Sequence, residues 1–118
     1  MVLAVLDDLL FTSKIKTAAG ALGVAVTFAR SADAAVAEMK KAAPALVLLD
    51  LNNPRTDPLG LVERMKADPA LAMVPTVGFA SHVQTDVIAA ARRAGVADVM
   101  ARSAFVQRLP EILQRTRP

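Results

Sequence analysis

The sequence predicts an α/β fold, a three-layer sandwich in which helices cover both faces of a five-stranded parallel sheet. Short apolar runs alternate along the chain with longer segments of helical periodicity, which gives a (βα)5 pattern. Strands that are joined through helices must run parallel, with right-handed crossovers. The apolar runs are nearly continuous, and such runs are typical of a sheet that is buried on both faces.

Each element follows from one of these runs or periodic segments. The expected strands are residues 2–6, 24–28, 45–49, 76–80 and 97–101. The expected helices are, to within a few residues, 10–22, 32–42, 58–67, 83–94 and 104–116. Ser31 is placed to cap the second helix, and Pro44 to stop it before the third strand. Asp57 and Pro58 form a cap and first-turn pair for the third helix, and Gly95 suits the end of the fourth.

The composition indicates a globular protein of one domain, residues 1–118. Hydrophobic residues make up 54% of the chain and charged residues 21%, which excludes a disordered composition. Cysteine is absent, which excludes disulfides, thiolate metal sites and a cysteine nucleophile and fits a reducing cytoplasm. No apolar run approaches the roughly 20 residues that cross a bilayer, and residues 1–6 lack a basic leader. We therefore expect a cytoplasmic protein without membrane contact.

Charged residues follow the first, third and fifth predicted strands. Asp7 and Asp8 follow the first, Asp50 the third and Arg102 the fifth. Ligands of open parallel sheets bind beyond the carboxyl ends of the strands, so these side chains are expected on one rim. Three carboxylates there repel one another unless a cation lies among them, and Mg²⁺ prefers oxygen ligands and leaves positions for phosphate oxygens. Asp50 is then placed to act as a nucleophile toward a phosphoryl group, with Arg102 pairing with the charge.

These residues belong to longer motifs, through which the chain resembles a response regulator receiver domain of two-component signalling. The motifs are "VLDD" at 5–8, "LVLLDLNNPRTDPLGL" at 46–61, "ADPALAMVPTV" at 67–77 and "AGVADVMARSAF" at 94–105. The resemblance covers essentially the whole chain and implies a flavodoxin-like sandwich with strand order 2-1-3-4-5. The first and fifth helices would cover one face of that sheet, and the other three helices would cover the opposite face.

The resemblance also implies a role for each residue of the rim. Asp7, Asp8 and Asp50 would bind Mg²⁺ together with the backbone carbonyl of Asn52. Asp50 would accept the phosphoryl group, and Arg102, where the family has lysine, would contact it. The donor would be a sensor histidine kinase or a phosphotransfer protein. The chain itself would be no enzyme, with at most self-phosphorylation and self-dephosphorylation chemistry.

Besides Arg102, four positions depart from the family pattern. Ala80 stands where a threonine or serine hydroxyl would contact the phosphoryl group, and Ser81 is a substitute only if the loop shifts by one residue. Val99 replaces an aromatic residue whose rotamer often reports the state of the site. Ser103 replaces a proline, so a cis peptide is no longer expected there, and Pro58 replaces a glycine. Acceptance of phosphate is expected to survive these changes, whereas signalling by the usual route is not.

Simpler interpretations stay open beside these. Asp7 and Asp8 would serve as caps alone if no metal is bound, and Asp50 would then be a loop acid. Asp57 is interpreted as a helix cap. His82, the single histidine, either borders the phosphoryl site or lies in a solvated loop.

A group of basic residues lies in and around the last two predicted helices: Arg92, Arg93, Arg102, Arg108, Arg115 and Arg117. In receivers this surface docks dimers and output partners, and a solvated helix face is the ordinary alternative. No aromatic residues interleave with these arginines, so direct nucleic-acid binding is not expected.

Two functions therefore remain. The first is an atypical receiver that accepts phosphate on Asp50 and signals through its last two helices, to a downstream protein or as a homodimer. The alternative is a pseudo-receiver, a protein-binding or dimerisation module that works without phosphorylation. An enzyme such as a phosphatase is disfavoured, because no glycine-rich phosphate loop follows the first strand.

Overall fold

A computed structural model describes residues 1–81 and 84–116. Its elements are, in chain order, β1 (Val2–Val5), α1 (Leu9–Leu22), β2 (Val26–Ala29), α2 (Ala32–Lys41), β3 (Leu46–Asp50), the 3₁₀ turn η1 (Pro54–Thr56), α3 (Pro58–Ala67), β4 (Thr76–Ala80), α4 (Thr85–Ala94), β5 (Asp98–Ala101) and α5 (Arg102–Gln114). The predicted strands and helices are all present. Three details of the prediction were wrong: β2 begins two residues later than expected, η1 was not expected, and α5 begins directly at the end of β5, two residues earlier than expected.

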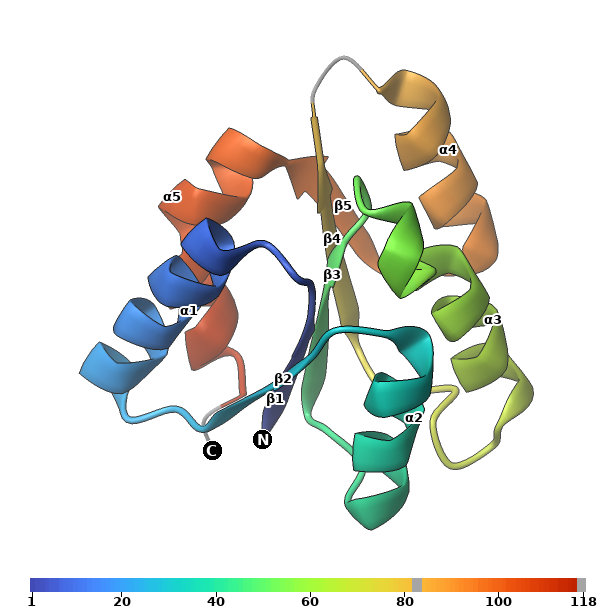
Figure 1. Cartoon of the computed structure of the whole chain (residues 1–118), viewed down its shortest axis with the longest axis horizontal. Helices are drawn as coiled ribbons and strands as arrows, with labels where there is room; N and C mark the ends of the chain where they lie inside the picture. The colour runs from blue at the N-terminus through green and yellow to red at the C-terminus, as the bar shows by residue number, and fades with distance from the viewer. Residues whose placement is uncertain (82–83, 117–118) are drawn as a thin grey trace.

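The strands form one parallel sheet in the order β2-β1-β3-β4-β5, which confirms the predicted topology. In register, Val5 of β1 pairs with Leu49 of β3, and Asp50 of β3 pairs with Phe79 of β4. Figure 1 shows the sheet nearly edge-on, with α1 and α5 on one face and α2, α3 and α4 on the other. The predicted distribution of the helices is thus confirmed as well.

The two faces of the sheet bury different side chains. Between the sheet and the α1–α5 layer, Phe11, Phe79 and Phe105 stack, with ring centroids 5.2 Å apart for the first two and 4.3 Å apart for the last two. The opposite core is aliphatic and includes Ala80 and Val99. The aromatic stack therefore lies on the side of the sheet from which α1 and α5 approach the rim.

The predicted helix boundaries are confirmed in three places. Ser31 accepts a hydrogen bond from the backbone N–H of Ala34 and caps α2. Asp57 caps α3 through Gly60 N–H at 3.3 Å, in a left-handed conformation with φ of 47°. Gly95 ends α4 with φ of 111°, a conformation in which a side chain would be strained. Among the helices of the described residues, none combines the length and the apolar character that a bilayer crossing requires.

Candidate functional site

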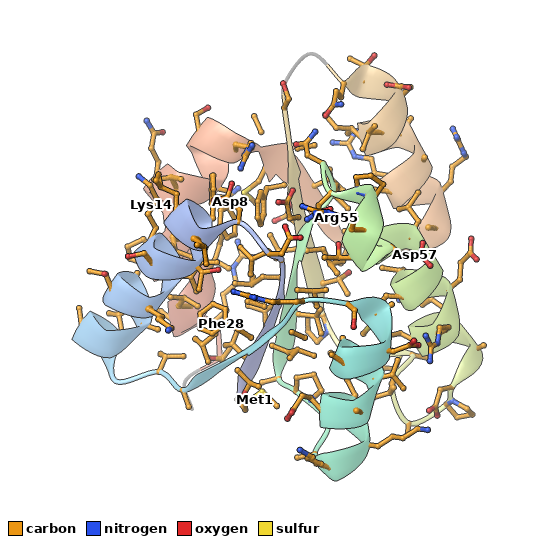
Figure 2. All side chains as sticks on the ribbon, viewed as in Figure 1. Met1, Asp8, Lys14, Phe28, Arg55 and Asp57 are labelled. Atoms are coloured by element: carbon orange, nitrogen blue, oxygen red, sulfur yellow. The ribbon has the colours of Figure 1, made fainter. Side chains whose placement is uncertain are left out.

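The parallel sheet brings the predicted rim residues to one end of the molecule. Asp7 and Asp8 lie between β1 and α1, Asp50 is the last residue of β3, and Arg102 is the first residue of α5. In Figure 2, Asp8 and Arg55 are labelled at this end of the sheet, on the segments that follow β1 and β3. The sequence therefore placed these side chains on the correct edge, and their contacts show how they are held there.

Asp50 is the buried acid of the site, with only 4% of its surface exposed. Its Oδ1 accepts a hydrogen bond from the backbone N–H of Asn52 at 3.0 Å, whereas no described residue donates one to its Oδ2. Burial raises the pKa of Asp50, and the negative charges of Asp8 and Asp7 act in the same direction. The Asn52 N–H and the positive charge of Arg102 oppose this rise. The surroundings of Asp50 therefore disfavour its ionised form.

Asp8 is held from two directions. Its Oδ1 accepts hydrogen bonds from the backbone N–H groups of Leu10 at 2.9 Å and Phe11 at 3.1 Å, which makes it the N-cap of α1. Its Oδ2 lies 3.3 Å from Nη2 of Arg102. The hydrogen bond from Phe11 is the main cause that lowers the pKa of Asp8, and Leu10 and Arg102 add to it against the effect of burial. Asp8 therefore caps α1, while its role toward a metal ion stays a prediction.

Asp7 is held by the loop that follows β3. Nδ2 of Asn53 donates a hydrogen bond to Oδ1 of Asp7, and Nη2 of Arg55 lies 3.2 Å from its Oδ2. Neither Asn53 nor Arg55 was expected at the site. Both lie within five residues of Asp50 along the chain, which is the one signal in the sequence that pointed to them.

Asn52 joins the loops after β3 and β4. Its side-chain Oδ1 accepts a hydrogen bond from the backbone N–H of Ser81 at 2.8 Å. The sequence predicted a role only for its backbone carbonyl. Ser81 is half-buried at this position, and its role as a substitute hydroxyl stays a prediction.

Arg102 lies over an aromatic ring. The centre of its guanidinium group is 4.3 Å from the ring centroid of Phe11, a cation–π contact that suits a planar cation better than a lysine ammonium. Its Nε is buried and has no hydrogen-bond partner among the described residues. Arg102 is thus held by Phe11 and Asp8, and its buried Nε–H is left without an acceptor among the described residues.

The positions that depart from the family pattern are packed as core or loop residues. Ala80 is fully buried and Val99 is 9% exposed, both within the aliphatic core beneath α4. Ser103 is exposed in the first turn of α5, and no peptide bond of the described residues is cis. Pro58 is buried at the start of α3. His82 lies outside the described residues.

The oxygen donors fit a hard divalent ion in kind. Asp7 and Asp50 offer carboxylates and Asn52 a backbone carbonyl, which are the donors that Mg²⁺ takes. As they are arranged, however, no three acidic or imidazole side chains of the described residues form a ready metal-binding group. Arg102 and the Arg55 loop engage Asp8 and Asp7 instead.

The fold and the site together define the class of protein: it is a flavodoxin-like α/β protein with an acidic site at the carboxyl edge of its parallel sheet. The model of the response regulator receiver domain family matches residues 2–114. The chain therefore belongs to the response regulator receiver domain family. Receiver domains generally bind Mg²⁺ at their acidic pocket and interact with histidine kinases or phosphotransfer proteins.

Solved structures agree with this assignment. The receiver domain of NtrX from Brucella abortus is 25% identical, with a TM-score of 0.82, and the match covers 98% of this chain and 97% of that one. A longer NtrX chain from Brucella abortus is 26% identical, with a TM-score of 0.81. This match covers 98% of the present chain but 26% of the longer one. No curated protein matches the sequence.

Two further structures share the fold. The chemotaxis response regulator CheY4 of Vibrio cholerae is 19% identical with a TM-score of 0.83, over 98% of this chain and 96% of that one. The phosphorylated cyanobacterial phytochrome response regulator RcpA is 24% identical with a TM-score of 0.80, over 97% of this chain and 88% of that one.

Proposed function

We propose that this chain accepts a phosphoryl group on Asp50, with Mg²⁺ bound, as the receiver of a cytoplasmic phosphorelay. The donor is a phosphohistidine on a sensor histidine kinase or a phosphotransfer protein. The observation that carries the proposal is the state of Asp50, a buried carboxylate with Oδ1 fixed by Asn52 and Oδ2 without a described donor. An oxygen with this freedom at the carboxyl edge of the sheet is placed to react.

The transfer needs little from the protein besides position and charge. A lone pair of Asp50 Oδ2 attacks the phosphorus, and the new O–P bond forms as the donor's N–P bond breaks. The electron pair returns to the donor's imidazole, which takes a proton from solvent. Arg102, 3.3 Å from Asp8, supplies positive charge beside the phosphoryl oxygens. Any further chemistry is confined to hydrolysis of the acyl phosphate, so we propose no other catalytic activity.

Asp7, Asp50 and the carbonyl of Asn52 would hold the metal ion, with Asp8 beside them. When bound, Mg²⁺ neutralises charge on the carboxylates and on the transferred group. The raised pKa of Asp50 supports this assignment, because its ionised form is disfavoured without such a cation.

We further propose that the output differs from that of a typical receiver. Ala80 has no hydroxyl to follow the phosphoryl group, and the buried Val99 has no aromatic ring to move. Ser81 is the hydroxyl nearest in sequence to the missing one. The surface of α4, β5 and α5 is the proposed docking site, where Arg92 and Arg93 are exposed near the end of α4. A downstream protein or a second copy of the chain would bind there.

The charges on the surface of α4, β5 and α5 also indicate which kind of partner would bind there. Arg108 pairs with Glu111 at 3.5 Å, and Arg115 pairs with Asp98 at 3.6 Å. These arginines are therefore partly neutralised by acids of the same face. A mixed-charge surface favours a protein partner over nucleic acid.

The pseudo-receiver remains the second candidate, and one observation favours it. Arg55 and Arg102 already provide positive charge for Asp7 and Asp8 without a metal ion. A module of this kind would dock its partners whether or not Asp50 is modified.

Acetyl phosphate distinguishes the two candidates. The protein is incubated with it, with and without Mg²⁺, and the intact mass is followed for addition of a phosphoryl group. A receiver is modified only with Mg²⁺, and Asp50→Asn abolishes the modification. Absence of modification in the wild type at saturating Mg²⁺ would exclude the receiver and leave the pseudo-receiver.

A further inference from the structure

The loop after β3 presents two side chains to one carboxylate. Asn53 donates a hydrogen bond to Oδ1 of Asp7, and Arg55 pairs with Oδ2 at 3.2 Å. Both oxygens of Asp7 are thus engaged by the segment that follows Asp50. A metal ion that binds at the site would need access to the Asp7 carboxylate, since Asp8 already caps α1.

The turn that carries Arg55 is built from its own residues. The side chain of Asn53 accepts a hydrogen bond from the Arg55 backbone N–H at 3.0 Å, and the hydroxyl of the buried Thr56 donates to the Asn53 carbonyl at 3.0 Å. The Asp57 N–H closes η1 on the Pro54 carbonyl at 3.1 Å. Because these bonds are local, the direction in which Arg55 projects follows from the turn and not from Asp7 alone.

We propose that Arg55 is an internal counter-ion for Asp7, and that a divalent metal ion must displace it to bind. This inference rests on the proposed metal site and deepens it. A metal ion on Asp7 would lie about 2 Å from a carboxylate oxygen, and the guanidinium group lies 3.2 Å from the same carboxylate. Two cations at such short distances repel each other, so the binding of one weakens the binding of the other.

The surroundings permit the displacement. The side chain of Arg55 is 81% exposed, so its ion pair is weak and its charge can return to water. Beside the turn, a cavity of about 440 Å³ separates Pro54 and Pro58 from Val87 of α4. η1 therefore has space on one side into which it can shift. Metal binding would release the loop that leads into α3.

The test compares two arginine-to-alanine variants that change the net charge equally. Arg55→Ala removes the counter-ion of Asp7. Arg64→Ala removes a second exposed arginine, which pairs with Asp33 at 3.0 Å between α3 and α2. Metal-free wild type and both variants are titrated with MgCl₂, and the backbone amide signals of Asp50 and Asn52 are followed by NMR. The side-chain Nε–Hε signals of Arg55 and Arg64 are followed in the wild type.

We expect Arg55→Ala to bind Mg²⁺ about two- to fivefold more tightly than both the wild type and Arg64→Ala. The Arg55 Nε–Hε signal of the wild type shifts with the same midpoint as the Asp50 amide, while the Arg64 signal does not shift. The difference between Arg55→Ala and the wild type shrinks as NaCl is raised, because salt screens an exposed ion pair.

Equal Mg²⁺ affinities for Arg55→Ala and Arg64→Ala would overturn the inference and leave the proposed receiver intact. Tighter binding by Arg55→Ala without modification by acetyl phosphate would support the inference while refuting phosphate acceptance. If no variant binds Mg²⁺, the metal site and the inference both fail.

Discussion

At Asp50, burial and the neighbouring negative charges both favour the protonated form of the carboxyl group. The carboxylate lies at the end of a strand whose other residues are aliphatic, and it is nearly as buried as they are. Asp7 and Asp8 add negative charge near it, and Arg102 alone among the causes of its pKa brings a positive charge. The folded protein therefore holds a proton on Asp50 more tightly than the unfolded chain does. That preference is the cost of burying an ionisable carboxylate in this place.

Without metal, Asp50→Asn should stabilise the protein at neutral pH. The folded-state pKa of Asp50 is raised from its ordinary value of 3.8, so wild-type stability falls as the pH rises through the folded pKa. Asparagine does not titrate, and its Oδ1 can still accept the Asn52 hydrogen bond. The gain is about 1.4 kcal/mol for each tenfold rise in the proton affinity of Asp50.

This stabilisation is measured by urea unfolding in EDTA at several pH values. The difference between Asp50→Asn and the wild type should widen from acidic to neutral pH and then stay constant. A difference that does not depend on pH would mean that the change acts through packing. Saturating Mg²⁺ should reduce the difference, because a bound cation favours the ionised wild-type carboxylate.

The site residues also show which positions could be predicted from the sequence and which could not. Asp50 and Arg102 were located because strand ends of a parallel sheet share one edge, a consequence of topology that any chain of this pattern obeys. Arg55 was not located from the sequence, because a loop arginine is usually solvated. The direction in which its side chain projects depends on the turn that carries it. The bonds of η1 that aim it arise between side chains and backbone groups in a conformation that residue types alone do not specify.

At the scale of the element, α1 begins at the functional site. Asp8 caps this helix and pairs with Arg102, while Phe11, in the first turn, provides the ring against which Arg102 lies. The start of α1 is therefore built from the same side chains as the site. The remaining first-turn residues, Leu9 and Leu10, are 70% and 66% exposed.

Two substitutions separate the cap from the charge of Asp8. Asparagine caps helices as well as aspartate does, whereas alanine does not. We expect Asp8→Ala to be less stable to unfolding than Asp8→Asn by about 1 kcal/mol. Asp8→Asn should differ little from the wild type at neutral pH, since its lost ion pair with Arg102 is partly exposed.

Urea unfolding followed by far-UV circular dichroism, in the absence of Mg²⁺, tests this order. Any advantage of the wild type over Asp8→Asn should disappear as the pH falls, because the pKa of Asp8 is lowered in the folded state. Equal stability of the alanine and asparagine variants would show that the cap contributes nothing.

Across the whole molecule, the sheet separates two cores of different character. The α1–α5 side holds the aromatic stack, and the α2–α3–α4 side is aliphatic. Alternating apolar runs predicted the layers, and the resemblance to receiver domains implied which helices cover which face. The joining of β5 to α5 without a loop was not predicted, because Ala101 both ends the strand and precedes the first helical residue. Apolar periodicity alone does not mark such a boundary.

The aromatic stack should account for much of the stability of the fold. Phe105 is fully buried against Phe79, so Phe105→Ala should lower the free energy of unfolding by about 3–5 kcal/mol. Phe28, which is half-buried beneath Lys16, serves as the comparison. Phe28→Ala should cost clearly less in the same urea experiment. Similar losses for the two variants would contradict a stabilising role of the stack.

The ion pair between Asp8 and Arg102 joins residues 94 positions apart in the chain. A growing polypeptide that has reached only β4 already contains all three carboxylates but no Arg102. Those acids would then meet without the guanidinium group that offsets them, and α1 would lack its contacts with α5. The contacts of the site are therefore complete only after β5 and the first turn of α5 have been made.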